Sequence, residues 1–253
     1  MKKKLAIIFA GGSGARMGAG LPKQFIEVNG KAIIIHTLDI FEEHPDIDEI
    51  YIACKEDYIP RLKKLIQRHM ITKVKDVVPG GASGQDSIRN ALLAAKENNE
   101  EDAIVLIHDG VRPCIGKEVI DEAIQSVLES GSAVTCTALY ETPVISNDGK
   151  TVDDVPPRSK FYTAQAPQCF YLGDVLDAHD KMRALNPTYE GVVDTCTLMR
   201  KLGKKVSIIE GPRGNIKVTT PEDLYTFRAM IQYRESEQIF GFAGREVSSK
   251  LVK

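Results

Sequence analysis

Short apolar runs alternate with amphipathic stretches along most of the 253-residue chain. Apolar runs of this length indicate buried strands, and the stretches between them have the spacing of helices with one buried face. The expected strands are residues 5–10, 49–54, 74–78, 103–108, 133–139 and 205–210. The expected helices are residues 32–41, 57–69, 85–96, 117–129, 173–185, 193–202 and about 221–236. This alternation predicts a mostly parallel sheet covered on both faces, with ligands at the carboxyl ends of the strands.

One segment, residues 141–160, interrupts the alternation. It contains Asn147-Asp148-Gly149-Lys150, which is typical of a hairpin turn, and then Pro156-Pro157. We expect a β-arm that leaves the main domain and packs on something else, often a second subunit. The remainder of residues 1–238 is expected to form a single domain, followed by a polar tail over residues 239–253.

Composition and charge narrow the class of protein. The formal net charge is -2, from 33 basic and 35 acidic residues, which argues against a general nucleic-acid binder. No segment is long and apolar enough to span a bilayer, and the apolar run after Met1-Lys2-Lys3-Lys4 is too short for a signal peptide. Five cysteines without a CxxC pair predict reduced thiols. We therefore expect a cytoplasmic protein.

A glycine-rich loop follows the first expected strand. It runs Ala10-Gly11-Gly12-Ser13-Gly14-Ala15-Arg16-Met17-Gly18 and is followed by Leu21-Pro22-Lys23-Gln24-Phe25. Such a loop at the end of a parallel strand indicates a phosphate site, because backbone N–H groups can approach the oxygens. No Gly-Lys-Ser/Thr sequence closes it as in a Walker A loop, and the third glycine of a dinucleotide fingerprint would fall on Met17. The cations Arg16 and Lys23 suit a nucleotide triphosphate under attack.

These strings resemble the opening of the sugar-nucleotide pyrophosphorylase superfamily. Within it, the chain resembles the family that holds 2-C-methyl-D-erythritol 4-phosphate cytidylyltransferase and D-ribitol-5-phosphate cytidylyltransferase. Further matching strings are Pro79-Gly80-Gly81 with Asp86-Ser87, His108-Asp109-Gly110-Val111-Arg112-Pro113, Ala166-Pro167-Gln168, and the stretch from Asn215-Ile216-Lys217 to Pro221-Glu222-Asp223-Leu224. The resemblance implies a three-layer α/β/α Rossmann-like nucleotidyltransferase fold with a protruding β-arm, a homodimer, and Mg²⁺-assisted transfer of CMP from CTP to a polyol phosphate.

The resemblance also assigns roles to residues. The implied catalytic residues are Arg16, Lys23, Arg158 and Lys217. The residues implied to hold CTP are Phe9, Ala10, Gly11, Gly12, Gly14, Gly80, Gly81, Ala82, Ser83, Gly84, Gln85, Asp86, Ser87 and Gly110. Thr142, Arg112 and Asp194 are implied to bind the acceptor, with Thr142 and Arg158 reaching across the dimer.

Local patterns leave alternative roles open for several of these residues. Asp109 follows a buried strand, where a carboxylate facing a triphosphate suits Mg²⁺ but could equally form a helix cap or a salt bridge to Arg112. Ser87 and Asp86 stand where either could cap a helix. His108 is expected to be structural.

The acceptor is the less defined substrate. Ala10-Gly11-Gly12, the Leu21–Phe25 string and Asp194-Thr195-Cys196 resemble the ribitol-phosphate branch, whereas Ala166 stands where both branches usually carry threonine. We expect D-ribitol 5-phosphate, with 2-C-methyl-D-erythritol 4-phosphate as the alternative. A non-catalytic nucleotide-binding subunit is a further alternative, against which the intact cations argue.

The loop cations generate a first prediction. Arg16→Ala and Lys23→Ala should each lower kcat by about 10²-fold or more, because fixed cations stabilise the charge that develops on the transferring phosphoryl group. Steady-state kinetics measure the loss, and circular dichroism checks that the fold survives. A variant that keeps most of its kcat would show that its residue does not contact the transition state.

Overall fold

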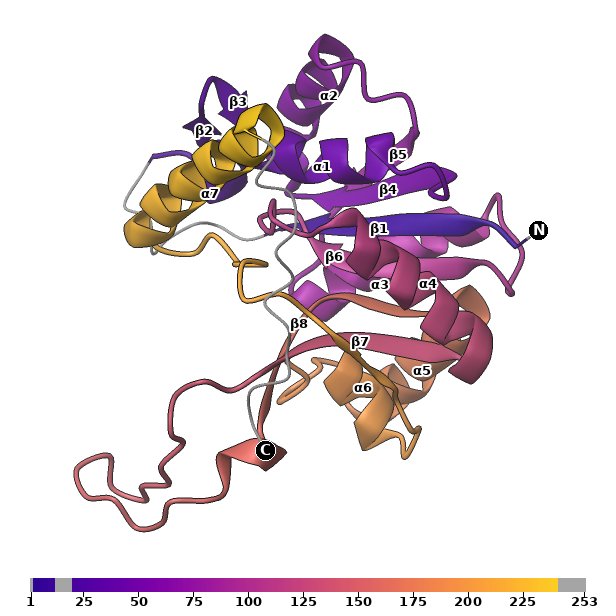
Figure 1. The fold of residues 1–253 in the computed structure, drawn as a ribbon. Coiled ribbons are helices and arrows are strands. Elements are labelled where there is room, and N and C mark those ends of the chain that lie inside the picture. The colour runs from indigo at the N-terminus through magenta and orange to yellow at the C-terminus, as the bar shows by residue number, and fades with distance from the viewer. Residues whose placement is uncertain (1, 12–19, 241–253) are drawn as a thin grey trace.

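The chain is described by a computed structural model over residues 2–11 and 20–240 (Figure 1). Within this part, seven strands form one sheet in the order β5–β4–β1–β6–β8–β7–β9. The strands are β1 (Lys4–Ala10), β4 (Glu49–Cys54), β5 (Val74–Pro79), β6 (Ile104–Asp109), β7 (Ser132–Ala138), β8 (Tyr162–Tyr171) and β9 (Ile208–Glu210). Neighbours run parallel except that β8 is antiparallel to both β6 and β7. A separate small ribbon pairs β2 (Glu27–Val28) with β3 (Lys31–Ala32).

Helices cover both faces of the sheet because successive side chains of each central strand point to opposite sides. In β1, Ala6 and Ile8 belong to the core under one set of helices, and Leu5 and Ile7 to the core under the other. The first set is α1 (Ile33–Glu43), α2 (Ile59–Arg68) and α4 (Lys117–Ser130). The second set is α3 (Gly84–Lys96), α5 (Leu172–Leu185) and α6 (Thr195–Lys201). The predicted three-layer α/β/α fold is therefore confirmed.

The last helix, α7 (Pro221–Phe240), packs on a third, smaller cluster beside β2 and β3 (Figure 1). Phe227 is its buried anchor, and its ring meets that of His36 edge-on with centroids 5.1 Å apart. The Asp223 carboxylate accepts hydrogen bonds from the backbone N–H groups of Thr219 and Thr220 at 2.7 and 2.8 Å. These contacts fix the segment that precedes the helix, which carries Asn215 and Lys217.

The sequence analysis identified every strand of the large sheet except β8. This strand contains Pro167, which has no N–H to donate and normally marks an edge or an irregularity. The ladder with β7 is indeed irregular there: Val134 pairs with Gln168 and Cys136 with Ala164, so one residue of β7 spans the interval occupied by residues 165–167. An interior strand is expected to be a nearly continuous apolar run, and Gln165, Pro167 and Gln168 interrupt that pattern in β8.

The segment between β7 and β8 projects from the body of the molecule, as predicted (Figure 1). Its regular pairing is limited to one antiparallel bridge between Ile145 and Asp154, so the arm is less strand-like than its hairpin sequence predicts. Gly149 takes a left-handed backbone with φ of 69° at the turn. Val144, Val152 and Val155 are all more than half exposed. The arm thus carries apolar side chains that its own chain does not cover.

Two further expectations concern the whole chain. All five cysteines are free, and Cys54, Cys114, Cys136 and Cys169 are buried, as expected for reduced thiols. Over residues 2–11 and 20–240, we find no helix with the length and apolar character needed to cross a bilayer.

Candidate active site

Two adjoining cavities open at the carboxyl ends of the central strands. The larger cavity, about 500 Å³, lies between the end of β1 and the loop that enters α3. Its lining includes Ala10, Gly11, Lys23, Gln24, Gly81, Ala82, Ser83, Gly84 and Ser87. The smaller cavity, about 200 Å³, lies against β6, β8 and the start of α6. Its lining includes Gln85, Arg112, Ala164, Gln165, Ala166, Gln168, Val193, Asp194 and Thr195. The two share Phe9, Gly84, Asp109 and Lys217, so a ligand in each would meet at these residues.

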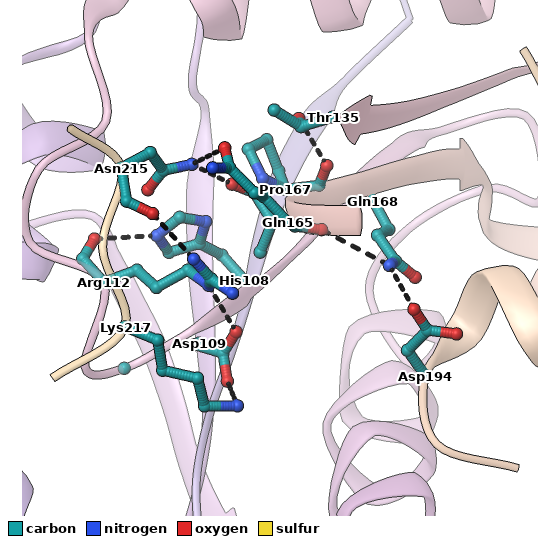
Figure 2. A network of polar contacts seen from close by, with 12 residues as sticks. His108, Asp109, Arg112, Thr135, Gln165, Pro167, Gln168, Asp194, Asn215 and Lys217 are labelled. Atoms are coloured by element: carbon teal, nitrogen blue, oxygen red, sulfur yellow. Dashed lines mark hydrogen bonds and ion pairs between the residues drawn. The ribbon is translucent and has the colours of Figure 1, made fainter. Parts of the chain in front are cut away.

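Asp109, the last residue of β6, is the centre of this junction. It is 6% exposed, and its two carboxylate oxygens have different partners. Arg112 Nε donates to Oδ2 at 3.0 Å, and Lys217 Nζ forms an ion pair with Oδ1 (Figure 2). Burial by itself raises the pKa of the Asp109 carboxyl, but the charges of Lys217 and Arg112 outweigh burial and hold that pKa below its ordinary value. The carboxylate is therefore ionised and neutralises two neighbouring cations.

Arg112 connects this centre to the segment that carries Lys217. Its Nη1 donates to the backbone carbonyl of Asn215 at 2.7 Å. Asn215 is fully buried, and its Nδ2 donates to the carbonyl of Ala166 at 2.7 Å and to Gln165 Oε1 at 3.2 Å (Figure 2). The segment before α7 is thereby tied to the irregular part of β8. The contacts made by the carbonyl and the side-chain amide of Asn215, two residues before Lys217, therefore hold Lys217 at the junction.

His108 forms a hydrogen bond to the backbone of the loop that carries Arg112. Its ring is fully buried, and Nε2 lies 3.0 Å from the carbonyl oxygen of Arg112, so the ring donates its proton there. Burial lowers the pKa of His108 to about 4, which leaves the imidazole neutral at pH 7. The structural role expected from the sequence agrees with this geometry.

The far wall of the smaller cavity is built by Gln168 and Asp194. Gln168 Nε2 donates to Asp194 Oδ2 at 2.9 Å, and its Oε1 accepts from the backbone N–H of Cys196 at 2.8 Å. Asp194 caps α6, with Oδ1 accepting from the backbone N–H of Thr197 at 2.7 Å. Thr135 Oγ1 donates to the carbonyl of Pro167 at 2.7 Å and closes the ladder irregularity (Figure 2). The predicted acceptor residues Arg112 and Asp194 thus face one cavity.

Sequence reasoning assigned no role to Gln165, Gln168 or Asn215. Two of them were visible as parts of quoted motifs, Ala166-Pro167-Gln168 and Asn215-Ile216-Lys217. Their function as connectors depends on contacts between segments far apart in the chain, which no local pattern shows.

The loop at residues 80–87 is organised by its own side chains. Ser83 is the N-cap of α3: its Oγ accepts from the backbone N–H of Asp86 at 3.0 Å, and Asp86 Oδ2 accepts from Ser83 in return, a capping box. Asp86 Oδ1 also pairs with Arg183 at 3.0 Å. Ser87 Oγ accepts from the N–H of Gly81 at 3.0 Å and donates to the carbonyl of Ser83 at 3.0 Å. Three polar side chains of the loop are therefore engaged within the protein.

Two glycines allow the loops after β1 and β5 to approach each other. A Cβ atom at Gly11 or at Gly80 would lie 3.1 Å from Ser87 Oγ, tighter than ordinary packing. Gly110 is similarly close to Ala10 and donates its N–H to the carbonyl of Phe9 at 3.0 Å. Gln24 Nε2 donates to the carbonyl of Ala10 at 2.7 Å, which holds the Leu21–Phe25 string and its buried Lys23 against the end of β1.

The remaining predicted residues fall into two groups. Arg16, Gly12 and Gly14 lie outside the described residues. Thr142 and Arg158 lie on the arm and line neither cavity of their own chain. Arg158 Nη1 donates to the carbonyl of Tyr140 at 2.7 Å at the base of the arm. The described residues of one chain therefore bring together Lys23, Asp109 and Lys217 but not Arg158.

Few of the described side chains near the junction could coordinate Mg²⁺. The described part of the chain holds no group of three or more His, Cys, Asp or Glu side chains arranged to bind a metal. Mg²⁺ is commonly held by one or two carboxylates together with substrate phosphates and water. Asp109 would supply the single carboxylate of such an ion.

The chain is similar to known cytidylyltransferases in sequence and in fold. The family model described as 2-C-methyl-D-erythritol 4-phosphate cytidylyltransferase (IspD) matches residues 5–233. The chain is 47% identical over 238 residues to ribitol-5-phosphate cytidylyltransferase of Streptococcus agalactiae serotype V, covering 94% of this chain and 98% of that protein. It is 38% identical over 224 residues to 2-C-methyl-D-erythritol 4-phosphate cytidylyltransferase of Clostridium botulinum, covering 88% and 95%. The crystal structure of 4-diphosphocytidyl-2C-methyl-D-erythritol synthase from Anaerococcus prevotii superposes with a TM-score of 0.78 at 30% identity, covering 91% of this chain and 96% of that one.

The Asp109 centre makes a prediction about stability and pH. The pKa of Asp109 is lower in the folded state than the unfolded value of about 3.9, so its carboxylate stabilises the fold above about pH 4. This stabilisation is lost as pH falls through the folded-state pKa. Asp109→Asn should lower the free energy of unfolding by about 1.5–3 kcal/mol at pH 7, because Arg112 loses a charged partner. Urea titrations at pH 7 and pH 3 measure it.

The difference in the free energy of unfolding between the wild type and Asp109→Asn should become smaller towards pH 3. Asp57→Asn, at an exposed carboxylate, is the matched control and should leave the unfolding free energy nearly unchanged at both pH values. An equal difference at pH 7 and pH 3 would mean that the ionised carboxylate is not the stabilising species.

Proposed function

The chain belongs to the 2-C-methyl-D-erythritol 4-phosphate cytidylyltransferase (IspD) family, as its motifs predicted, and we propose that it transfers CMP from CTP to D-ribitol 5-phosphate with release of pyrophosphate. It is a cytidylyltransferase. One observation carries the choice of acceptor: the chain is 47% identical to a ribitol-5-phosphate enzyme over 94% of its length, against 38% over 88% for a methylerythritol-phosphate enzyme.

In this proposal, the larger cavity holds CTP and the smaller cavity holds the polyol chain of the acceptor. The loops at residues 9–11 and 80–87 offer backbone N–H groups and close packing to the nucleotide. Both phosphate groups then meet at the shared residues, near Asp109 and Lys217. The acceptor phosphate would then lie close to the α-phosphate of CTP.

The reaction is an attack by an acceptor phosphate oxygen on the α-phosphorus of CTP. The new P–O bond forms as the bond from the α-phosphorus to the bridging oxygen breaks, and pyrophosphate leaves with that electron pair. A phosphate monoester is already anionic at pH 7, so no side chain has to remove a proton. Positioning and fixed charge supply the catalysis. Bound Mg²⁺ would neutralise triphosphate charge, with Asp109 as its protein ligand.

Lys217 is suited to bind the phosphates when both substrates are present. Its side chain is 42% exposed, in contrast to the 9% of the Asp109 side chain it pairs with. Lys217 can therefore turn from Asp109 towards a phosphate without leaving an unpaired carboxylate, because Arg112 remains bound to the other oxygen. Lys23 and Arg16 complete the set of cations on the nucleotide side.

The arm supplies the acceptor phosphate site of a second subunit in a homodimer. Two observations support this. Arg158 and Thr142 line neither of the two cavities formed by the described residues of their own chain, and the arm that carries them projects with Val144, Val152 and Val155 exposed. A guanidinium binds a phosphate through paired hydrogen bonds, which suits Arg158 for the task.

Substrate choice tests the proposal directly. With purified protein and Mg²⁺, pyrophosphate release should require CTP, and UTP should be used far less well, because a site that hydrogen-bonds one base edge leaves groups unpaired with another. D-Ribitol 5-phosphate should exceed 2-C-methyl-D-erythritol 4-phosphate in kcat/KM by about tenfold or more. The reverse preference would establish the methylerythritol acceptor instead. No turnover of any polyol phosphate would favour a non-catalytic nucleotide-binding subunit.

The dimer is tested by complementation. Arg158→Ala and Lys217→Ala should each be poorly active alone, because the acceptor phosphate loses a charged ligand worth about 1.5–3 kcal/mol. When the two variants exchange subunits, one site of each heterodimer keeps both residues, so activity should return towards one working site per heterodimer. Lys160→Ala, on the same short 3₁₀ turn as Arg158, is the matched control and should stay active. A monomer by sizing, or no recovery after verified exchange, would show that Arg158 does not act across an interface.

A further inference from the structure

Two polar side chains that line the smaller cavity are buried without a hydrogen-bond partner. Gln85 lies in the first turn of α3 and is 3% exposed; Thr195 opens α6 and is 1% exposed. Neither Gln85 Oε1 nor Thr195 Oγ1 has a partner among the residues that the structure describes. Buried polar atoms of folded proteins are nearly always paired with protein, water or a ligand. Two unpaired atoms on residues of one cavity wall point to a ligand that supplies the missing partners.

The position of these atoms distinguishes them from other unpaired groups. Eight buried side-chain atoms of the described chain lack a partner, and their residues include His108 and Asn215. Only Gln85 and Thr195 among them line the smaller cavity, and none lines the larger one. Among the described residues, those that both carry such an atom and line one of the two cavities are therefore confined to the cavity assigned to the acceptor.

The chemistry of the wall indicates what the ligand presents there. An amide and a hydroxyl are neutral, whereas the charged groups Asp109, Arg112 and Lys217 lie at the junction with the larger cavity. A phosphate suits the charged end, and neutral hydroxyls suit the other. A ligand hydroxyl both donates and accepts, so it can pair with Thr195 Oγ1 and with either end of the Gln85 amide.

We propose that Gln85 and Thr195 bind hydroxyl groups of the acceptor's polyol chain and make the enzyme select an unbranched polyol phosphate. This inference rests on the proposed function. It assigns Gln85 to the acceptor, whereas the resemblance implied that Gln85 holds CTP, because Gln85 lines the smaller cavity and not the larger one. A site that hydrogen-bonds a hydroxyl rejects an analogue without it, because the buried polar groups are then left unpaired. The methyl-branched acceptor carries one hydroxyl fewer and places a methyl group in this cavity. It therefore offers Gln85 and Thr195 one hydroxyl fewer to pair with.

The test combines enzyme variants with deoxy acceptors. Thr195→Val removes the hydroxyl while keeping the shape, and Gln85→Leu does the same for the amide. With saturating CTP, kcat/KM is measured for D-ribitol 5-phosphate and for its monodeoxy analogues. In the wild type, kcat/KM should be about tenfold lower for the analogue that lacks the hydroxyl bound by Thr195 than for D-ribitol 5-phosphate. In Thr195→Val, kcat/KM for D-ribitol 5-phosphate should fall about tenfold, whereas kcat/KM for that analogue should stay at its wild-type value. In Gln85→Leu, kcat/KM should become equal for D-ribitol 5-phosphate and for a different analogue, the one that lacks the hydroxyl bound by Gln85.

Controls separate this role from a structural one. Thr195→Ser keeps a hydroxyl and should retain the wild-type discrimination, which also covers the case in which Thr195→Val does not fold. Thr226→Val makes the same chemical change on the exposed side of α7 and should leave all kinetic constants unchanged. The KM for CTP should not change in any of these variants.

Two results would overturn the inference. Variants that still discriminate among the deoxy analogues as the wild type does would show that Gln85 and Thr195 do not bind acceptor hydroxyls. A rise in the KM for CTP with unchanged acceptor discrimination would assign them to the nucleotide. Failure of the proposed function is a separate outcome, since a wild-type enzyme that turns over no D-ribitol 5-phosphate shows it before any variant is made.

Discussion

The charge balance at Asp109 is the constraint on which the rest of the site depends. A site for two phosphorylated substrates needs several cations close together, and in the empty protein those cations repel one another. Asp109 offsets part of this repulsion by pairing with Arg112 and Lys217 from a nearly buried position at the end of β6. It also fixes where the two cations stand. Removing one member of a buried ion pair leaves an uncompensated charge, so the three side chains form a single unit.

The irregular pairing of β8 shapes one wall of the smaller cavity. Pro167 cannot donate to the ladder, and the residues around it are displaced from regular pairing with β7. The backbone carbonyl of Ala166 and the side chain of Gln165 are therefore available to Asn215, and Gln168 is available to Asp194. A regular ladder would use the backbone groups for strand pairing and would leave a flat surface at the same place.

What could be predicted from the sequence was mostly local. Buried strands such as β1, β4 and β6 follow from apolar runs, and the position of Asp109 at the edge of the sheet follows from its place after such a run. β8 could not be recognised because its proline and glutamines conceal the strand period. The contact from Arg112 to the Asn215 carbonyl joins residues 103 positions apart, and only packing brings them together. The unpaired state of Gln85 and Thr195 is likewise a property of the packed neighbourhood, although Gln85 already stood among the predicted binding residues.

The late position of Asn215 and Lys217 in the chain has a consequence for biosynthesis. The strands β1, β4, β5 and β6 are all made before residue 110, and they can pair while the rest of the chain is still being translated. Until residues 215–217 leave the ribosome, however, Arg112 lacks its carbonyl partner and Asp109 faces a single cation. A nascent or prematurely terminated chain can thus hold much of the sheet and still have no assembled junction between its two cavities. The junction is therefore completed only near the end of translation.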